Sequence, residues 1–536
     1  MVTWMTSAAR NKAKGSYLNP GETVSRRFKD IARHAASYYD DEDKVIEKGI
    51  LTLLMEGILA PSTPVWSNFG RTKGLPISCY GSVIEDNLHS IFDYQTQAAM
   101  LGKNGGGTSV YMGHIRPRGA VIGHGGYSNG VVPWLEVNKN RVEKVSQGGI
   151  RRGAEAAYVE FSSPDLIEVL QWRRENPDYN IGVNVRDTDL KQLEDGDMIA
   201  LGKWQRILKE RLETGEPYLI FIDKANRLSP FDEPILASNL CSEILIPSNN
   251  EETFVCCLSS LNAATHAKWA DTQAVFYSTL FLDAVMQEFI DKTAGKSAYD
   301  KARKSAVKYR TLGLGLLGLH TAFQQEMLPF DSMPARTLST LLTKHMQEES
   351  YKASLWIAAF KGVPEGCISH GRRNATTMAI APNTNSAFLC GEVSRGIEPI
   401  LANYTIQTQD KKTIERKNLT LKQHLVSIRR DTAAVWARIA EDSGSVQNLE
   451  FLSDEARKVF RTAYEIDQAS ILQMANARGR YIDQSQSLNL FLTSQSTPEE
   501  IHELHKYAAM SPYIKSLYYC RSKKGVRAEG CEACAS

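Results

Sequence analysis

The chain has 536 residues, of which 42% are hydrophobic and 23% are charged, a composition typical of a soluble globular enzyme. Its formal net charge of +2 gives no reason to expect nucleic acid or a membrane surface as a partner, and no apolar run is long enough to span a membrane. The basic N-terminus is not followed by the apolar segment of a secretory signal, so we expect a cytoplasmic protein with reduced cysteines.

The predicted elements begin with two helices. Residues 1–15 are polar and are expected to be loosely ordered, whereas apolar residues recur with a helical period over 23–39 and again over 43–59. From residue 61 to about residue 161, short apolar runs alternate with glycine-rich turns. This change of pattern predicts that a helical N-terminal segment precedes a different kind of domain.

The rest of the chain alternates between strand-like and helical patterns. The run 218–222 predicts a buried strand, and 204–212 and 279–292 predict helices. Such alternation favours an α/β fold. Residues 405–475 are charged and are predicted to be mostly helical, and the basic, glycine-containing stretch from Arg521 suits a flexible tail.

Two kinds of short motif point to nucleotide or metal binding but lack the context that such sites need. Gly313, Gly315 and Gly318 have the spacing of a dinucleotide-binding turn, but the preceding residues 308–311 make a poor buried strand. The region near residue 335, where an acidic residue on a second strand is required, contains proline, alanine and arginine. We therefore predict that the glycines allow close packing of helices. No two Cys-x-x-Cys pairs lie close together, so no structural metal site is expected.

The nine cysteines are the most informative residues of the chain. Cys241 lies between Asn239 and Glu243, and because side chains alternate along an extended segment, all three can face one way. That arrangement places a thiol beside a carboxylate and an amide. On these residues alone, a buried structural thiol with polar groups at a strand edge is the alternative interpretation.

Other thiols lie where redox chemistry would need them. Cys79 and Cys256 are distant from Cys241 in sequence, and Cys531 and Cys534 form a Cys-x-x-Cys pair near the end of the chain. Partner thiols and a terminal dithiol indicate redox catalysis. A metal-binding tail is the alternative for the terminal pair.

Several short blocks follow one another from about residue 60 to the C-terminus. They are Ser62-Thr63-Pro64, Ser78-Cys79, 146–151, 239–243, 256–262, 382–386, 396–399, 481–487, 517–519 and the Cys531/Cys534 pair. No single block is specific. Together and in this order, they resemble the large catalytic subunit of ribonucleotide reductase, most closely a class I form without the N-terminal ATP cone.

The resemblance implies an α/β fold built on a ten-stranded barrel of two antiparallel five-stranded halves, with a central finger loop that carries Cys241. It also implies a helical segment over 1–60, the barrel over 61–520 and a flexible redox-active tail over 521–536. The implied reaction replaces the 2′-OH of a ribonucleotide by hydrogen, with diphosphates as the expected substrates. Because no ATP cone is recognised, dATP is not expected to inhibit every substrate through this chain.

The resemblance also assigns roles to the residues around the central thiol. Cys241 is expected to carry a thiyl radical that removes the 3′ hydrogen of the substrate reversibly. Glu243 is expected to be the general base on the 3′-OH, and Asn239 is expected to hydrogen-bond the same region.

The reducing pair that the resemblance implies is Cys79 with Cys256, which must approach within about 6 Å between their Cα atoms to form a disulfide. Cys257 faces the opposite side of the same strand and is expected to be a core thiol. Cys531 and Cys534 are expected to carry electrons to this disulfide from thioredoxin or glutaredoxin.

The resemblance places the substrate diphosphate on backbone N–H groups near the start of a helix. On composition alone, an ordinary polar loop is the alternative for this segment. The residues expected to bind substrate are Thr63, Ser78, Pro382, Asn383, Thr384, Asn385 and Ser386.

The adjacent Tyr518 and Tyr519 bear on the source of the radical. In class I enzymes a separate metal-containing small (beta) subunit supplies the radical through tyrosines beside the catalytic cysteine, and no covalently bound cofactor is needed. In class II enzymes adenosylcobalamin supplies it without such a relay. We expect class I, and an adenosylcobalamin-dependent enzyme in which residues 516–520 are a plain β-strand is the alternative.

In the family, a second nucleotide site at the interface of a homodimer selects the base, with ATP and deoxynucleotides as effectors. Asp86 and Arg116 match contacts of that site, and Arg151 lies on the loop expected to communicate with the active site. A second arginine of some relatives aligns with Gly123 here, and Arg118 is a candidate substitute. A non-catalytic nucleotide-binding fragment is the remaining alternative, and the presence of all five key cysteines argues against it.

Overall fold

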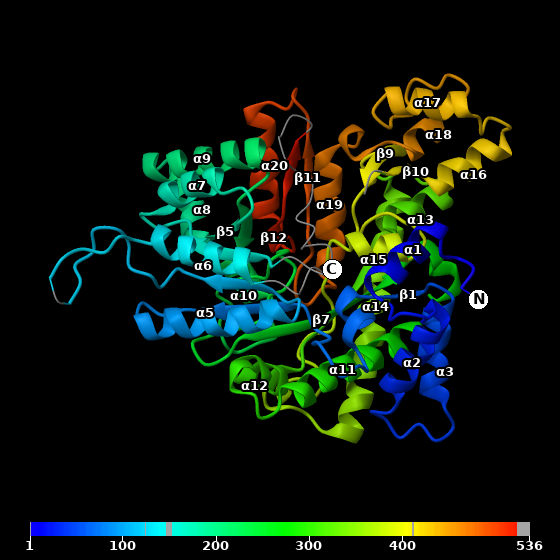
Figure 1. The fold of residues 1–536 in the computed structure, drawn as a ribbon. Helices are drawn as coiled ribbons and strands as arrows, with labels where there is room; N and C mark the ends of the chain where they lie inside the picture. The colour runs from blue at the N-terminus through cyan, green and yellow to red at the C-terminus, as the bar shows by residue number, and fades with distance from the viewer. Residues whose placement is uncertain (1, 124, 146–152, 410–411, 523–536) are drawn as a thin grey trace.

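The computed structural model describes residues 2–123, 125–145, 153–409 and 412–522. A curled sheet lies at its centre, with strand order β1-β7-β2-β3-β4-β5-β6-β12 and with β8 paired to β7 (Figure 1). These strands are β1 (Leu59–Pro61), β2 (Cys79–Val83), β3 (Gly107–Tyr111), β4 (Glu155–Glu160), β5 (Asn180–Val185), β6 (Tyr218–Phe221), β7 (Phe254–Asn262), β8 (Leu312–Leu317) and β12 (Ser516–Leu517).

The sheet closes into a barrel of two halves. Strands β2 to β6 pair in parallel and form one half. In the other half, β7 pairs in parallel with β8, and the extended segments 376–380, 484–490 and 516–520 continue the sheet through parallel bridges and backbone hydrogen bonds. The halves meet in antiparallel fashion at β2–β7 and at β6–β12. Seven strands and three extended segments, ten in all, confirm the predicted barrel.

Helices surround the barrel and cover its outer face (Figure 1). The first half is covered by α5 (Leu88–Lys103), α6 (Val132–Lys144), α7 (Leu166–Glu175), α8 (Asp187–Glu194), α9 (Met198–Thr214) and α10 (Ile222–Arg227). The remaining helices of the barrel region are α4 (Thr63–Asn68), α11 (Ala274–Thr293), α12 (Asp300–Tyr309), α13 (Leu319–Gln325), α14 (Met333–Lys361), α15 (Thr384–Leu389), α19 (Gln468–Gly479) and α20 (Pro498–Met510). Within the described ranges, no helix is both long enough and apolar enough to cross a membrane.

Two apolar clusters lie on opposite faces of the barrel strands. On β4, Ala156 and Tyr158 belong to the cluster inside the barrel, whereas Ala157 and Val159 belong to the cluster between sheet and helices. Side chains alternate along a strand, so a strand that is buried on both faces is apolar throughout. The inner cluster is the one that contains the candidate cysteines.

The N-terminal segment contains three helices, α1 (Ser7–Ser16), α2 (Val24–Ala36) and α3 (Val45–Met55). The two predicted helices correspond to α2 and α3, but the prediction of loose order before residue 16 is wrong. Thr6 caps α1 by accepting a hydrogen bond from Ala9 N, and the buried Ala9 and Ala13 pack against the rest of the protein. Strand β1 spans residue 60 and pairs with β7, so the helices lead directly into the barrel sheet.

The prediction that the glycines of 313–318 pack helices together is also wrong. They lie on strand β8, which pairs with β7. A Cβ atom on Gly313 would lie 2.4 Å from Leu258 Cδ2, and one on Gly315 would lie 2.8 Å from Ala379 O. The glycines therefore allow other segments to pack closely against a strand. The apolar run is also short, as is typical of a buried strand rather than a helix.

The region 405–475, predicted to be mostly helical, begins with a hairpin. Strands β9 (Tyr404–Gln409) and β10 (Lys412–Lys417) pair in antiparallel fashion. They precede α16 (Leu419–Ser427), α17 (Ala433–Glu441) and α18 (Asp454–Val459), which share a small apolar core of their own. This unit extends from the barrel at the upper right of Figure 1. The last described strand, β13 (Cys520–Ser522), pairs with β11 (Leu490–Leu492).

Candidate active site

The segment 228–253 between α10 and β7 forms the predicted finger loop inside the barrel. Both halves of the barrel hold it. Tyr158 OH on β4 donates to Asn239 O at 2.5 Å, and Ser487 Oγ on the opposite half donates to Cys241 O at 2.7 Å. Cys241 is buried, and its side chain belongs to the inner apolar cluster together with Cys79 and Cys256. The loop therefore brings the central thiol to the two strand thiols.

The tip of the loop is a tight turn, so the prediction of an extended segment from Asn239 to Glu243 is wrong. Ser242 has a φ of 62°, in the left-handed region. Asn239 Oδ1 accepts hydrogen bonds from Glu243 N at 3.1 Å and from Ile244 N at 3.2 Å, an arrangement in which an Asn side chain stabilises a turn. Asn239 Nδ2 also lies 3.8 Å from Cys79 Sγ, so this amide joins the turn to one of the strand thiols.

Glu243 is the titratable group of the loop tip. It is fully buried, and burial raises its pKa to about 7, against the opposing effect of hydrogen bonds from its own backbone, Asn239 and Ser487. Ser487 Oγ donates to Glu243 Oε2 at 3.3 Å, while Oε1 is buried and has no hydrogen-bond partner among the described residues. A carboxyl group with this pKa can accept or donate a proton near neutral pH.

Cys79 and Cys256 are opposite residues on the antiparallel strands β2 and β7. Such residues have Cα atoms about 4.5–5.5 Å apart, which is within the range of a disulfide. The structure shows no disulfide between them, and burial raises the pKa of Cys256 well above its usual value. Cys257 lies in the outer cluster, where its Sγ donates to Leu282 O at 3.3 Å, which confirms that it faces away from the pair.

Two residues of the site were missed in the sequence. Gln484 Nε2 donates to Cys256 Sγ at 3.4 Å, and Gln484 Oε1 accepts from Leu245 N of the finger loop at 3.1 Å. Ser487 contacts both Cys241 and Glu243, as described above. The block 481–487 is part of the resemblance, so the signal was present, but no role could be assigned to its individual side chains from the sequence.

Tyr518 and Tyr519 form a compact aromatic group with Tyr218, a residue for which sequence reasoning gave no role. The ring centroids of Tyr518 and Tyr519 are 4.3 Å apart, and Tyr218 lies 4.7 Å from Tyr518 and 5.1 Å from Tyr519. Tyr518 belongs to the inner cluster with Cys241, and Tyr519 is less buried. The pair lies between β12 and β13, so it is also part of the extended segment that closes the barrel.

The residues predicted to bind substrate come from three places in the chain. Thr63 begins α4, Ser78 immediately precedes Cys79, and Asn383 is the N-cap residue of α15, with a φ of 54°. Ser386 Oγ donates to Pro61 O at 3.4 Å, which links α15 to the segment that leads to Thr63. Two members are sequence neighbours of residues in the inner cluster: Ser78 precedes Cys79, and Pro382 follows Ala381. The set comprises Thr63, Ser78, Pro382, Asn383, Thr384, Asn385 and Ser386.

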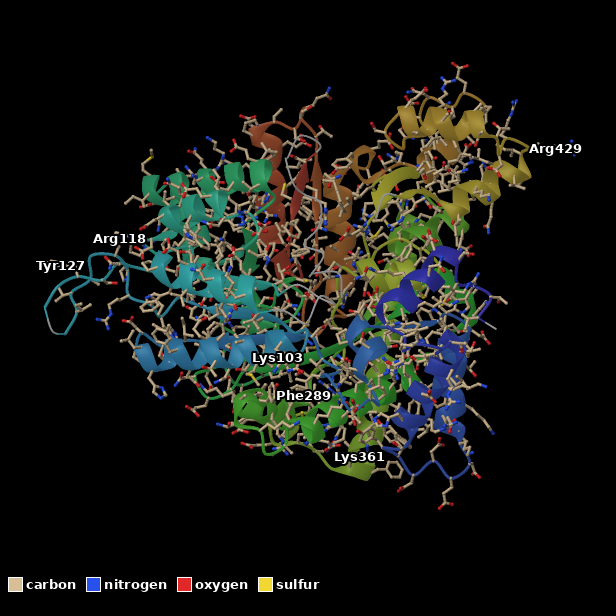
Figure 2. All side chains as sticks on the ribbon, in the orientation of Figure 1. Lys103, Arg118, Tyr127, Phe289, Lys361 and Arg429 are labelled. Atoms are coloured by element: carbon tan, nitrogen blue, oxygen red, sulfur yellow. The ribbon has the colours of Figure 1, made fainter. Side chains whose placement is uncertain are left out.

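The residues predicted for an effector site follow β2 and β3. Arg116 Nε donates to Asp86 Oδ2, and both side chains are partly exposed. Arg118 Nε donates to Glu168 Oε2 at 2.9 Å, and Figure 2 places Arg118 and Tyr127 on a loop that projects from the molecule. Arg151, Cys531 and Cys534 lie outside the described residues.

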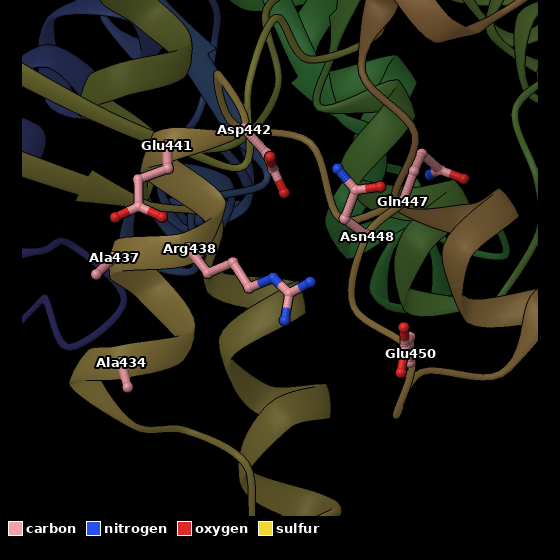
Figure 3. Close-up of a pocket in the computed structure, with 8 residues that line it drawn as sticks. All are labelled: Ala434, Ala437, Arg438, Glu441, Asp442, Gln447, Asn448 and Glu450. Carbon is pink, nitrogen blue, oxygen red and sulfur yellow. The ribbon is translucent and has the colours of Figure 1, made fainter.

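A separate cavity of about 600 Å³ lies in the α16–α18 unit (Figure 3). It is lined by charged and amide side chains from α17 and the segment after it, and none of its lining residues is a cysteine. The thiols therefore concentrate inside the barrel rather than at this cavity.

Comparison with known proteins agrees with the barrel and its contents. The family model "Ribonucleotide reductase, barrel domain" matches residues 77–203, 200–367 and 360–520. The class Id ribonucleotide reductase alpha subunit of Actinobacillus ureae is 37% identical, with a TM-score of 0.91 and 98% of each chain covered.

Two curated relatives are similar over most of the chain. The ribonucleoside-diphosphate reductase large subunit of Invertebrate iridescent virus 3 is 30% identical over 604 residues, covering 96% of this chain and 93% of the relative. The vitamin B12-dependent ribonucleoside-diphosphate reductase of Mycobacterium tuberculosis is 28% identical over 542 residues, covering 94% and 76%. The chain therefore belongs to the ribonucleotide reductase large-subunit family, the enzymes that reduce ribonucleotides.

Proposed function

We propose that the chain reduces ribonucleoside diphosphates to 2′-deoxyribonucleotides, with a thiyl radical on Cys241 as the reactive group. The observation that carries the proposal is the meeting of three features inside one closed barrel. These are the buried Cys241, the opposed thiols of Cys79 and Cys256, and a carboxyl group on Glu243 whose pKa lies near 7. Relatives named as ribonucleoside-diphosphate reductases support the choice of diphosphates.

The proposed reaction gives each of these groups a defined step. The Cys241 radical takes the 3′ hydrogen atom of the substrate, and Glu243 takes the 3′-OH proton. The 2′-OH then leaves as water. Cys79 and Cys256 supply two electrons and two protons as they join in a disulfide. Glu243 returns its proton to the 3′ oxygen and Cys241 returns the hydrogen atom to C3′, so the radical is recovered and the net change is the exchange of a hydroxyl group for hydrogen.

Substrate binding is assigned to residues that border this centre. Backbone N–H groups at the start of α15, in the segment 383–386, are suited to the negative charge of a diphosphate. The hydroxyl groups of Thr63 and Ser78 are proposed to line the ribose side. Asn239 is proposed to orient the region of the 3′-OH, since its amide already bonds to the turn that carries Glu243.

The radical is proposed to enter through Tyr519 and Tyr518 from a metal-containing small subunit. The ring centroids of Tyr518 and Tyr519 are 4.3 Å apart, and Tyr519 is less buried than Tyr518. This arrangement suits the transfer of an electron between the surface and the inner cluster. Entry from adenosylcobalamin is the second candidate, because a vitamin B12-dependent relative is similar over 94% of this chain.

Regeneration of the thiols is assigned to Cys531 and Cys534, with thioredoxin or glutaredoxin as the external reductant. Asp86, Arg116 and Arg151 are proposed to contribute to a nucleotide effector site at the interface of a homodimer. The exposed apolar side chains of Leu88 and Phe92 on α5 lie beside this region and would be covered by a second copy of the chain.

One assay separates the candidates. The purified chain is given a ribonucleoside diphosphate and dithiothreitol, with either the small subunit of the same organism or adenosylcobalamin. We expect deoxyribonucleotide only with the small subunit. Product with adenosylcobalamin alone would establish the second candidate, and no product under either condition would overturn the proposed function.

A further inference from the structure

Gln484 contacts one thiol of the reducing pair, and this makes the two sulfur atoms unequal. Its Nε2 lies 3.4 Å from Cys256 Sγ, 3.0 Å from Leu312 O and 2.9 Å from Thr376 Oγ1. The side chain is fully buried, and Leu245 N fixes its Oε1 at 3.1 Å. The amide is therefore fixed in place, and its two N–H groups are shared among Cys256 Sγ and these two oxygen atoms.

Cys79 has a different surrounding. Its Sγ lies 3.8 Å from Asn239 Nδ2 and 3.8 Å from Ser78 Oγ, longer than the contact that Gln484 makes to Cys256. Cys79 is 7% exposed, whereas Cys256 is 1% exposed. Cys79 is therefore the less enclosed residue of the pair, which favours its sulfur as the point of attack.

Reduction of a disulfide by a thiolate needs two different properties from its two sulfur atoms. The attacked sulfur must be accessible, and the other sulfur must leave as a thiolate. Burial raises the pKa of Cys256, so its release as a thiolate is unfavourable unless a donor stabilises the charge, and the hydrogen bond from Gln484 lowers that pKa. A hydrogen bond from an amide to a charged sulfur is stronger than one to a neutral sulfur, so Gln484 favours the departing thiolate over the disulfide.

We propose that the dithiol which regenerates the enzyme attacks Cys79 Sγ, and that Cys256 leaves as a thiolate stabilised by Gln484. The inference rests on the proposed function, in which Cys79 and Cys256 form the disulfide. The attacking thiolate forms a new S–S bond to Cys79 as the Cys79–Cys256 bond breaks, and the electron pair of that bond goes to Cys256, which then takes up a proton. A second thiol of the same dithiol releases Cys79. Gln484 is thus a positioning residue for the leaving group.

The test uses the full chain with Cys531→Ser and Cys534→Ser, so that an added reductant replaces the terminal dithiol. The protein is oxidised by one turnover of substrate with the small subunit, treated briefly with glutathione, quenched with an alkylating reagent and mapped by peptide mass spectrometry. Glutathione has one thiol and therefore leaves the mixed disulfide in place. We expect glutathione on Cys79 and the alkyl group on Cys256, in a ratio of about ten to one or more.

Variants of Gln484 test the role of the amide. Gln484→Met removes the donor, and Gln484→Glu removes it while keeping an acceptor for Leu245 N. Both are expected to slow glutathione attack about tenfold and to bring the two adducts toward equal amounts. Gln486→Met is the matched control, because Gln486 is buried on the same segment but bonds to Arg478 and Ala475. It is expected to keep the adduct ratio even if it lowers stability.

The outcomes distinguish this inference from the function on which it rests. A turnover disulfide that joins other cysteines would overturn both. A Cys79–Cys256 disulfide with glutathione mainly on Cys256 would overturn the inference alone. So would a Gln484→Met or Gln484→Glu protein that folds and keeps the rate and adduct ratio of the parent.

Discussion

Cys79 and Cys256 face each other across the seam at which the two halves of the barrel meet. Their strands, β2 and β7, run antiparallel there, and each strand is also paired on its other edge, β2 with β3 and β7 with β8. The backbones of both residues are thus fixed at a separation that suits a disulfide. Oxidation and reduction of the pair can proceed by side-chain rotation, without movement of the sheet.

The first prediction concerns the central thiol. Cys241→Ser should abolish turnover, because an alcohol does not form the sulfur radical, while the similar size of serine preserves the buried loop tip. Equilibrium binding of nucleotides and the thermal unfolding midpoint should stay close to those of the parent. Cys257→Ser is the matched control, since this buried thiol lies on the outer face of β7 and should tolerate a hydroxyl group that also donates to Leu282 O. Normal turnover by Cys241→Ser would refute the mechanism.

The pH dependence of turnover should follow Glu243. A general base must be deprotonated, and burial raises the pKa of this carboxyl group to about 7. The rate of the chemical step should therefore rise with pH through about 7 and level off above it. Glu243→Gln should lower that rate by about 10²–10⁴-fold and remove the rise. A pH profile that is unchanged in the glutamine variant would assign the base to another residue.

The same carboxyl group should make the folded protein less stable as the pH rises from acidic to neutral. Its folded-state pKa lies above the unfolded value, so the folded protein binds this proton more tightly, and its contribution to the free energy of unfolding falls as pH rises from about 4.5 to about 7. At about 1.4 kcal/mol per pKa unit, the loss reaches about 3 kcal/mol. Glu243→Gln should recover part of it at pH 8 and little at pH 4, as measured by denaturant unfolding at both values. Equal effects at the two pH values would contradict this assignment.

The aromatic pair should be needed for radical entry. Tyr519→Phe and Tyr518→Phe keep the rings and their packing but remove the hydroxyl proton that a tyrosyl radical must lose. Each should abolish turnover with the small subunit while leaving nucleotide binding unchanged. Tyr404→Phe, on the hairpin outside the barrel, serves as the control. Turnover of Tyr519→Phe at the parent rate would mean that the radical does not arrive through this residue.

A methyl group added at Gly313 on β8, the strand next to β7, should disturb the reducing pair. The Cβ atom of Gly313→Ala would lie 2.4 Å from Leu258 Cδ2 and 3.2 Å from Cys256 Sγ, so we expect a loss of about 1–3 kcal/mol in the free energy of unfolding and slower disulfide formation. Gly202→Ala on α9 has no neighbour within 4 Å and should raise stability by about 0.5–1 kcal/mol. Denaturant unfolding of both variants checks the contrast, and equal effects would contradict it.

Much of the architecture was accessible from the sequence because the ordered blocks specify the barrel, and because neighbours on a strand face opposite ways. That Cys256 and Cys257 face opposite ways follows from that rule, whereas the choice of Cys256 as the one that faces the site came from the family pattern. Strand β8 was mistaken because its glycines resemble a loop or helix contact when the strands that pack against it are not in view. The prediction for β8 failed because tertiary packing overrides the local sequence pattern.

The loop tip and its supports could not be predicted for a related reason. The left-handed backbone of Ser242 is local, but its neighbours are held by residues from elsewhere in the chain, as the bond from Ser487 to Cys241, 246 residues apart, illustrates. Gln484 and Tyr218 are likewise ordinary residues until the fold places them beside Cys256 and Tyr518. Periodicity reports which face a side chain takes, whereas the identity of its partner depends on the closed barrel.

The finger loop is fastened on one side by Tyr158 and on the other by Ser487, so it cannot take its final shape until both walls around it exist. Contacts between residues so far apart in sequence form late and slowly in folding. We therefore expect a nascent chain to emerge from the ribosome with Cys241 still unassembled, and to remain chemically inert until almost all of it has been synthesised.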